Sequence, residues 1–534
     1  MNAPPLRGRA ASRRHAALVA ALAVMVLAVA CASLPEQVER EPAVAFAEPE
    51  STWLGRYFAD GMAEHPGENG FALLASGRQA LLTRLAVIEV AEKSIDAQYF
   101  IWHGDDSGRL VMDALLRAAA RGVRVRLLID DAHAQGQDLA WKTIDAEPNI
   151  EVRIFNPFAN RGSALSRGPE MIGRLGRLQH RMHNKLLAVD GQVGIVGGRN
   201  IGDEYFGVDA GFNFHDLDVL ASGPVVGDLL EGFDAYWNSE WAYPISVLRS
   251  EKKDPERSAE LRVRFARDVA ALDDFPYPTA FRGDEVRAQL DGLQDRFIWA
   301  SARAVFDVPT KVSGDESSEL VEALRDLVLG ADEEVLISSP YFSPSEASLE
   351  TPDTALQRGV VHRLLTNSAA SNNIVPAHSV YKKYRKRVLA SGVRIHELQA
   401  EPALRRDYLA PRAAGSRVGL HAKVVVVDRR DVFIGSYNFN KAGALLSTET
   451  ALIVSSPVLA EEIAAIIEDA MRPENSWQVV LDTPGKPGKP KSGSLAWIGV
   501  RDGREVRLTG EPDTGFFRTL SIGFYSLLPL KERI

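Results

Sequence analysis

Short runs of apolar, often β-branched residues recur along the chain and are separated by longer amphipathic segments. Runs of this kind are typical of strands buried in a sheet, whereas Leu110–Ala119 and Tyr381–Leu389 have the pattern of helices. The runs in the first half are Ile95–Phe100, Val123–Ile129, Val152–Phe155, Leu186–Val189 and Val193–Val196. Those in the second half are Val335–Ile337, Val361–Leu365, Val393–Leu398, Val424–Val427 and Val432–Ile434. The alternation of strands and helices predicts an α/β sandwich in each half.

The second half of the chain repeats polar residues of the first half in register. His183, Lys185, Asp190, Gly197, Gly198 and Asn200 are matched by His421, Lys423, Asp428, Gly435, Ser436 and Asn438, at a constant offset of 238 residues. Neighbouring segments are also alike, since Ser94–Phe100 resembles Glu334–Phe342 and Asp216–Pro224 resembles Glu449–Pro457. A repeat this long indicates two copies of a domain rather than a solenoid. We therefore expect the two histidines to meet at one shared site.

The repeat sets the expected domain boundaries. We place the first domain at residues 51–248 and the second at residues 318–480. The charged, helical-looking segment 249–317 breaks the repeat and is interpreted as a connector. Residues 481–534 begin as a Gly- and Pro-rich linker and end in the apolar tail Phe516–Leu530. The tail is too short to span a bilayer, so it either lies in a membrane interface or packs on the protein.

Net charge and cysteine content limit the kinds of molecule that the protein is expected to bind. The net charge of −9 and the pI of about 5.8 disfavour a protein whose main affinity is for phosphate backbones, so no nucleic-acid partner is expected. The single cysteine excludes internal disulfides and a thiolate metal cluster. Neither feature specifies an oligomeric state.

The N-terminus has the pattern of a targeting segment. A positive region with four arginines precedes the apolar run Ala16–Ala30, which ends at Cys31, the only cysteine in the chain. Small residues before a cysteine resemble a bacterial lipobox, although Ala28–Ala30 would also suit ordinary signal peptidase. We expect residues 1–31 to form a lipoprotein-type signal peptide with lipidation at Cys31, followed by a flexible tether over residues 32–50. The protein is then exported and anchored to a membrane facing the periplasm, either the inner or the outer one.

The repeated polar residues suit chemistry at phosphorus. A neutral imidazole can attack phosphorus, and an ammonium group two residues along a strand faces the same side and can hold phosphoryl oxygens. Asn200 and Asn438 can each add a donor, and the small residues Gly197, Gly198, Gly435 and Ser436 allow a close approach of the backbone. No metal cluster is visible in the sequence, so no metal and no cofactor are expected, and the two lysines and two asparagines must balance the phosphate charge.

Four carboxylates accompany these groups. Asp216 and Glu449 occupy equivalent positions, and we expect each to accept the Nδ1 proton of the histidine in its own repeat, leaving Nε2 free. Asp190 and Asp428 are counted with the catalytic set in a supporting role, because their spacing suits a turn or a structural ion pair.

The paired motifs resemble those of the phospholipase D superfamily, over roughly Ser51–Trp477. The resemblance implies two tandem α/β/α sandwich domains related by pseudo-twofold symmetry, with the active site between them and a phosphohistidine intermediate. By the usual order in the family, His183 is the nucleophile and His421 the general acid and base, and the pseudo-symmetry leaves the reverse open.

Three further stretches, Tyr99–Trp102, Gly198–Phe206 and Glu511–Phe516, resemble bacterial cardiolipin synthases of the class without two N-terminal membrane helices. That resemblance implies phospholipid substrates, a membrane surface as partner and a phosphatidyltransferase that makes cardiolipin or a related lipid. A hydrolytic phospholipase D, a nuclease and a non-catalytic membrane-binding protein are the alternatives. Transfer and hydrolysis share one covalent intermediate, so the motifs leave both open.

Several other residues have two interpretations. Tyr99 and Tyr341 begin equivalent aromatic pairs and either line the pocket or belong to the core. His378 precedes the basic helix and either contacts a headgroup or faces solvent, whereas His215 is interpreted as a structural histidine.

Overall fold

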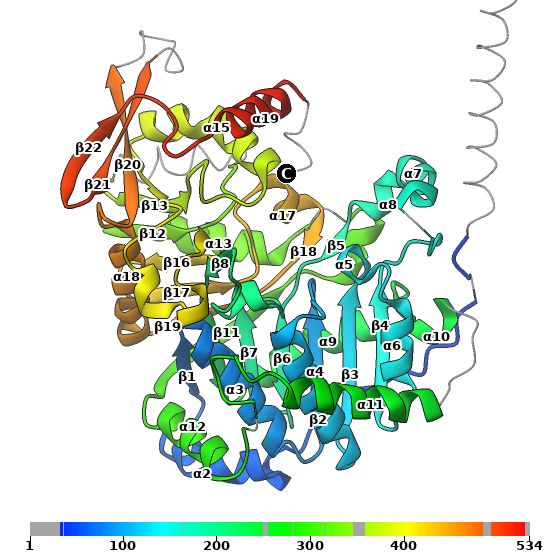
Figure 1. Ribbon diagram of the computed structural model, residues 1–534. Coiled ribbons are helices and arrows are strands. Elements are labelled where there is room, and N and C mark those ends of the chain that lie inside the picture. The colour runs from blue at the N-terminus through cyan, green and yellow to red at the C-terminus, as the bar shows by residue number, and fades with distance from the viewer. Residues whose placement is uncertain are drawn as a thin grey trace, which may run out of the picture.

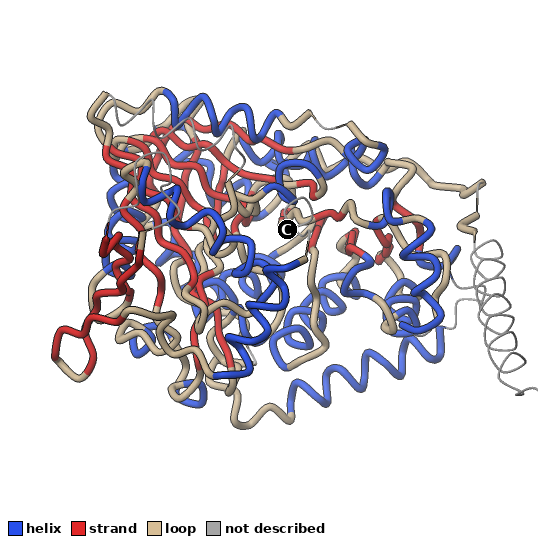
Figure 2. Tube along the Cα trace, turned by 90° about the horizontal axis from the view of Figure 1, so that it is seen from above, coloured by secondary structure: helices blue, strands red, loops and turns tan. Residues whose placement is uncertain are grey.

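The computed structural model describes residues 33–35, 37–162, 164–248, 255–279, 281–315, 317–344, 358–483 and 493–528. Each half of the chain forms a mixed sheet with helices on its faces, and the two sheets lie beside each other (Figures 1 and 2). The predicted pair of α/β sandwiches is therefore confirmed. Cys31 and the predicted signal peptide lie outside the described residues. Within the described ranges, no helix combines the length and apolar character needed to cross a bilayer.

The sheet of the first half has the order β1–β9–β7–β6–β2–β3–β4–β10, in which β2, β3 and β4 are parallel. Its strands are β1 Asn69–Leu74, β2 Ser94–Tyr99, β3 Arg124–Asp130, β4 Ile150–Phe155, β6 Leu186–Val189, β7 Val193–Gly197, β9 Asp218–Ser222 and β10 Ala242–Pro244. Its helices are α2 Trp53–Glu64, α3 Gly77–Val90, α4 Asp106–Ala120, α5 Asp131–Ala134, α6 Asp138–Asp145, α7 Ala164–Gly173, α8 Leu175–Leu178, α9 Val225–Trp237 and α10 Ile245–Leu248. All five strand predictions for this half correspond to observed strands.

The second sheet has the order β19–β17–β16–β12–β13–β14–β20–β21–β22. Its strands are β12 Glu334–Ser338, β13 Val361–Asn367, β14 Arg394–Leu398, β16 Val424–Val427, β17 Asp431–Gly435, β19 Thr450–Ser455, β20 Ser476–Thr483, β21 Ser494–Arg501 and β22 Arg504–Leu508. Its helices are α13 Glu319–Leu329, α15 Val375–Ala390, α16 Arg405–Tyr408, α17 Lys441–Leu445, α18 Pro457–Met471 and α19 Phe516–Leu527. The five strands predicted here are again present.

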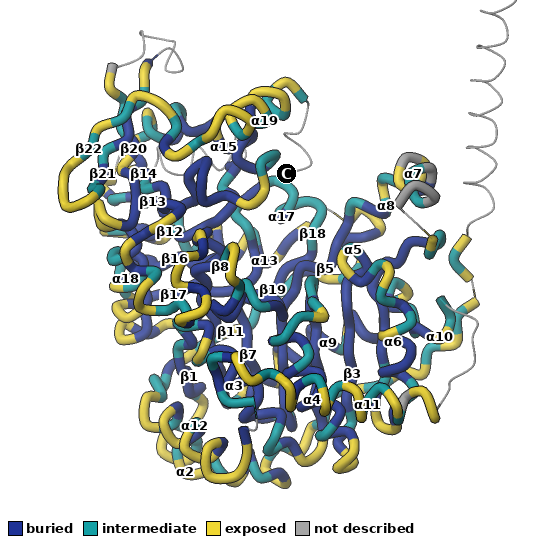
Figure 3. The backbone as a smooth tube through the Cα atoms, viewed as in Figure 1, coloured by how far each residue is buried: buried dark blue, intermediate teal, exposed yellow. Residues whose placement is uncertain are grey.

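One hydrophobic core runs through both halves. Apolar side chains from one face of each sheet meet around α9 of the first half and α18 of the second half in a single cluster of buried residues. The opposite face of the first sheet packs on α3 and α4, and that of the second sheet packs on α13 and α15. Figure 3 shows the strands as the buried interior of this arrangement. Because the halves share a core, they are positioned relative to each other by packing.

The segment predicted as a connector also contributes a strand to both sheets. It contains the helices α11 Pro255–Ala270 and α12 Asp284–Gln294, as its charge pattern suggests, but also the strand β11 Ile298–Phe306. Residues 298–300 of β11 pair with β1, and residues 301–306 pair with β19, so one strand belongs to both sheets. The prediction of a helical connector was wrong here, because the three alanines at the centre of Ile298–Phe306 lack the β-branched character of the other strands and obscure the strand pattern.

The predicted flexible tether is docked on the first domain from residue 37 onward. Two buried arginines donate into it, Arg126 to Ala43 O (3.1 Å) and Arg153 to Glu41 O (2.7 Å). Ala45 N donates to Asp234 Oδ2 (2.7 Å), which fixes the same stretch to α9. Buried guanidinium groups need acceptors, and these backbone carbonyls supply them. Flexibility was therefore the wrong prediction for this part of the segment.

The C-terminal region also differs from the linker and tail that its composition predicts. The strands β21 and β22 extend the second sheet, and α19 packs on α15 (Figure 1). The Gly- and Pro-rich stretch itself, 484–492, lies outside the described residues. Of the two interpretations of the tail, packing on the protein holds for one side of α19, where Ile522 is buried.

Candidate active site

Two pairs of short strands bring the histidines together. His183 directly follows β5 Arg181–Met182, which pairs in parallel with β18 Ser447–Thr448 from the second half. His421 directly follows β15 Arg417–Leu420, which pairs in parallel with β8 Phe212–His215 from the first half. His183 N donates to Thr448 O (2.9 Å) and His421 N donates to His215 O (2.8 Å). Each histidine is therefore held by the backbone of the opposite half.

The same pairing gives each histidine a carboxylate from the other repeat. His183 Nδ1 lies 2.9 Å from Glu449 Oε2, and His421 Nδ1 lies 2.6 Å from Asp216 Oδ2. The expectation that each carboxylate serves the histidine of its own repeat was wrong. The reason is topological, since Glu449 follows β18, the partner of β5, and Asp216 follows β8, the partner of β15.

Both imidazoles are neutral in this environment. Burial, reinforced by Lys185 and Lys423, holds the pKa of His183 well below its usual range. Burial and Lys423 lower the pKa of His421 to about 3, although Asp216 acts in the opposite direction. A neutral imidazole that donates from Nδ1 to a carboxylate keeps the lone pair of Nε2 free. Each histidine is thus prepared to act as a nucleophile or as a base.

The two carboxylates are not equivalent. Burial alone would raise the pKa of Asp216, but His421 and Lys423 outweigh it and hold that pKa below its ordinary value. Burial raises the pKa of Glu449 to about 7, against the opposing effect of Lys185. Asp216 is therefore ionised at neutral pH, whereas Glu449 titrates there.

Two buried ammonium groups complete the set. Lys185 and Lys423 each donate to the carbonyl oxygen of the histidine two residues earlier, within the short loops that connect β5 to β6 and β15 to β16. Burial lowers the pKa of Lys423 to about 8 and that of Lys185 well below its usual range, and the charge of Lys423 further lowers the pKa of Lys185. An anion bound between the two lysines would stabilise their charged forms and so offset the effects of burial and of charge repulsion. The predicted phosphate-binding role suits this arrangement.

The small residues of the motifs make room for the carboxylates. A Cβ atom on Gly198 would lie 2.1 Å from Asp216 Oδ1, and one on Gly435 would lie 2.3 Å from Thr450 O. Gly197 likewise lies against Asp218. Ser436 Oγ donates to Glu449 Oε2 and accepts from Thr450 N (3.0 Å). These positions hold the partners of the histidines in place.

The two asparagines occupy different environments. Asn200 Oδ1 accepts from Ile101 N (3.1 Å), which joins the loop after β2 to the loop after β7. Asn438 Oδ1 is buried and accepts no hydrogen bond from the described residues. Asn200 Nδ2 is likewise buried and donates no hydrogen bond within the described residues, so each asparagine keeps one unpartnered amide atom.

Asp190 and Asp428 lie away from the histidines, at turns. Both have a left-handed backbone, with φ of 53° and 50°. Asp190 accepts from the backbone N–H groups of Glu92, Lys93 and Ser94. Asp428 accepts from the N–H groups of Asp332, Glu333 and Glu334. Asp190 therefore fixes the start of β2, and Asp428 fixes the start of β12. Of the two interpretations from the sequence, a turn or a structural ion pair, the turn is the one observed for both residues.

Aromatic rings surround the histidines. The ring centroid of Phe100 lies 4.9 Å from that of His183, and those of Phe214 and Tyr205 lie 4.7 and 5.3 Å from that of His421. Tyr341 lies 6.3 Å from His421, which supports its interpretation as a pocket residue. Phe214 was not predicted from the sequence, where its only signal is its place one residue before His215.

Three other predicted residues are structural. Tyr99 is buried and its hydroxyl accepts from Arg84 Nε (3.3 Å), so the core interpretation holds. His378 is fully buried, and its Nε2 lies 3.5 Å from Glu511 Oε2. The predictions that it contacts a headgroup or faces solvent were therefore both wrong. His215 is buried and its carbonyl holds His421, in agreement with a structural role.

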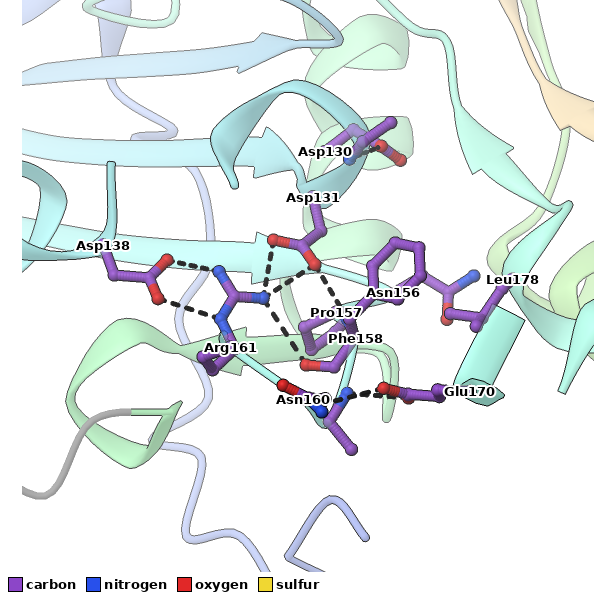
Figure 4. Close-up of polar contacts among 12 residues, drawn as sticks. Asp130, Asp131, Asp138, Asn156, Pro157, Phe158, Asn160, Arg161, Glu170 and Leu178 are labelled. Carbon is purple, nitrogen blue, oxygen red and sulfur yellow. Dashed lines mark hydrogen bonds and ion pairs between the residues drawn. The ribbon is translucent and has the colours of Figure 1, made fainter. Parts of the chain in front are cut away.

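A polar cluster not anticipated from the sequence surrounds the loop after β4 (Figure 4). Asp130 Oδ2 accepts from Met182 N (2.8 Å), one residue before His183. Arg161 pairs with Asp131 and Asp138, and Glu170 accepts from Ala159 N and Asn160 N. The cluster fixes the loop after β4 against β5. Within the described ranges, no three His, Cys, Asp or Glu residues form a group suited to a metal ion.

Comparison with known proteins agrees with this geometry. A family profile described as "Cardiolipin synthase, PLD-like domain" matches residues 85–237 and 324–471, once in each half. The chain is 36% identical to cardiolipin synthase C of Escherichia coli (strain K12) over 88% of this chain and 97% of that protein. It is 28% identical to cardiolipin synthase A of Pseudomonas syringae pv. syringae (strain B728a) over 75% of this chain and 68% of that protein.

One solved structure shares the fold. The crystal structure of phosphatidylserine synthase from Haemophilus influenzae Rd KW20 superposes with a TM-score of 0.51 at 15% identity, over 78% of this chain and 89% of that one. The fold and site define a phospholipase D-type protein with two tandem domains. The chain belongs to the PLD-like cardiolipin synthase family.

Removal of the Asp190 carboxylate should affect stability and not chemistry. In Asp190→Ala three backbone N–H groups lose their acceptor, so we expect the free energy of unfolding to fall by about 2–4 kcal/mol. Denaturant unfolding measures the loss, and kcat per folded molecule should be unchanged. Asp190→Asn, which keeps an acceptor oxygen, should lose less. A stable Asp190→Ala protein with low kcat would instead place Asp190 in the chemistry.

Glu449 should produce an acidic limb in the pH profile. With its pKa at about 7, Glu449 is protonated below that pH and no longer offers a negative acceptor to His183 Nδ1. Loss of the charge weakens the nucleophile, so kcat/KM should rise with pH through about 7. The pKa of His183 lies well below this range and does not contribute. In Glu449→Gln the limb should disappear and kcat should be low at every pH; a limb that persists would assign it to another group.

Proposed function

We propose that this protein is a phosphatidyltransferase that makes cardiolipin or a related phospholipid, by transferring a phosphatidyl group to the hydroxyl of a second lipid headgroup. The observation that carries the proposal is the cross-paired site, in which two neutral histidines, each on a carboxylate of the other half, adjoin two buried lysines. Relatives named cardiolipin synthase support lipid substrates.

The site supports a two-step reaction. His183 Nε2 attacks phosphorus, the bond from phosphorus to the donor headgroup oxygen breaks, and His421 gives a proton to that oxygen. The hydroxyl of the acceptor headgroup then loses its proton to His421 and attacks the phosphohistidine, which releases His183. Lys185 and Lys423 meet the negative charge that grows on the phosphoryl oxygens in both steps.

The different carboxylates support this division of roles. A proton carrier needs a partner that stabilises its imidazolium form, and the ionised Asp216 provides that for His421. A bound phosphodiester anion raises the pKa of both imidazoles, because nearby negative charge favours the protonated form. His421 can then carry a proton in the complex although it is neutral in the free site.

We further propose that the protein works at a membrane surface as an exported lipoprotein anchored at Cys31. The lipobox-like residues before Cys31 support the anchor. The docking of residues 37–50 on the first domain supports a short connection between that anchor and the catalytic body. Metabolic labelling with a palmitate analogue should mark the wild type and leave Cys31→Ser unlabelled.

Product analysis tests the reaction class. With phosphatidylglycerol vesicles, transfer yields cardiolipin and free glycerol, whereas hydrolysis yields phosphatidate and free glycerol. We expect cardiolipin as the main product. Phosphatidate as the main product at saturating acceptor would overturn the transferase proposal in favour of a phospholipase D.

The two histidines should differ in a trapping experiment. With a phosphodiester that carries a good leaving group, His421→Ala should still accumulate a phosphatidyl-enzyme, because attack needs only His183. His183→Ala should form none. Mass spectrometry of the quenched protein locates the adduct, and an adduct on His421 would reverse the two roles.

Loss of a lysine should slow the chemical step. In Lys185→Met the transition-state charge loses one of its preorganised partners, so kcat should fall at least about a hundredfold. Steady-state kinetics on a soluble phosphodiester measures the change, and a rise in KM alone would contradict the assignment. Chelators should leave wild-type activity intact; complete loss that a divalent ion restores would show that the chemistry needs a metal.

A further inference from the structure

Helix α19 presents an apolar face that no other described residue covers. Phe516, Phe517, Leu520, Phe524 and Leu527 are exposed by 59–84%, and they make up five of the twelve large apolar side chains exposed in the described part of the chain. Ile522 is the one residue of the helix that is buried. An apolar patch of this kind, concentrated on one element, usually marks an interaction surface.

Polar contacts hold α19 in this orientation. Arg518 donates to the carbonyl oxygens of Ala369 and Asn372, and Ser379 Oγ donates to Ile522 O (3.2 Å). Just before the helix, Glu511 accepts from the buried Arg385 of α15 (2.6 Å). The phenylalanines are therefore held outward on a fixed helix.

The surface is close to the candidate active site. Arg518 contacts the loop that follows β13, and in the same loop Asn373 Oδ1 accepts from the Tyr341 hydroxyl (2.6 Å) beside His421. At the end of β13, Asn367 exchanges hydrogen bonds with Leu420, the residue before His421. In the view of Figure 1, α19 lies above β5, β8 and β18, and Figure 3 shows much of the helix as exposed.

The charge of the surface favours a lipid partner. Helix α19 contains no Asp or Glu, and its single charged residue is Arg518. Arg417 lies close enough to Arg518 to lower its pKa, after the larger effect of burial. Lys382 of α15 forms an ion pair with Glu511 (3.6 Å), five residues before the helix. The lining of the pocket beside Phe516 and Phe517 also includes Glu401, Glu474, Asp502 and Asp513, so carboxylates border the helix as well as cations. The apolar face itself carries no negative charge, as in helices that lie in the interface of a phospholipid bilayer.

We propose that α19 is a docking surface for a phospholipid bilayer, which turns the mouth of the His183 and His421 site toward the headgroups. The proposal rests on the proposed function, because it supplies the route by which lipid headgroups reach that site. The apolar face enters the interface, and Arg417 and Arg518 lie at the level of the phosphates.

Site-specific quenching in the full-length protein tests the docking. In Phe524→Trp, added tryptophan fluorescence should be quenched by vesicles of phosphatidylglycerol with brominated acyl chains. The matched control is Val458→Trp on α18, because Val458 and Phe524 are equally exposed, at 59%. The control should gain no quenched component. An N-terminal anchor would bring both variants to the vesicle, so only contact of α19 with acyl chains separates them.

Activity provides the second measurement. Phe517→Ser combined with Phe524→Ser should lower turnover on vesicles at least about tenfold, because both side chains leave the apolar face. Turnover of a short-chain soluble phosphodiester and the Tm should match the wild type, since both residues are exposed. The pair Val263→Ser and Val458→Ser should change neither activity.

Three results would overturn the proposal. One is the absence of quenching at residue 524 while the wild type still turns over vesicle lipid. Another is loss of both activities together with a lower Tm, which would make the two phenylalanines part of the fold. The third is a concentration-dependent dimer in sedimentation that Phe517→Ser and Phe524→Ser abolish, which would make a second copy the occupant. Failure of the proposed function is seen separately, as a wild type that transfers nothing from either substrate.

Discussion

Each histidine of the site depends on a carboxylate from the other half of the chain. Glu449 holds His183 and Asp216 holds His421, so neither half contains a complete catalytic pair. The hydrogen bond from Nδ1 decides which ring nitrogen keeps a free lone pair, and this requires the two halves to be placed within a few tenths of an ångström. The other features of the fold keep the two halves in this relative position. The short parallel pairs β5–β18 and β8–β15 align the backbones. At a larger scale, β11 belongs to both sheets and one apolar core includes α9 and α18.

Much of this could be predicted from the sequence, because the informative residues recur in register. The strands around the motifs are nearly continuous apolar runs, and the offset of 238 residues identifies equivalent positions without any structure. The partner of each carboxylate could not be predicted in the same way. A repeat says that Asp216 and Glu449 are equivalent, but pairing within a repeat and pairing between repeats give the same sequence pattern. Only the crossing of β8 and β18 into the opposite half distinguishes them.

Other errors have local physical causes. Strand β11 was missed because the centre of Ile298–Phe306 is rich in alanine, which favours strands less than β-branched residues do, and because its charged neighbours suggested helices. The segment after residue 36 has the composition of a linker, yet it is fixed because the buried Arg126 and Arg153 need acceptors and find them in its backbone. His378 was expected to contact a headgroup or to face solvent, because it lies in a loop before a predicted basic helix. The helix instead turns Arg385 inward to Glu397 and Glu511, which places His378 in the interior.

The electrostatics of the free site also explain why a protein of net charge −9 can act on an anionic substrate. The overall charge repels anions at long range, but salt screens that repulsion beyond about 8–10 Å. Inside the site, desolvation destabilises the buried ammonium groups of Lys185 and Lys423, and the charge of Lys423 further destabilises that of Lys185. A phosphodiester bound between them removes part of that cost, so the attraction is local and is strongest where negative charge is concentrated. The charge on the phosphoryl oxygens is greatest in the transition state. An arrangement that is electrostatically unfavourable when empty therefore favours the transition state over the bound substrate, which is the condition for a faster chemical step.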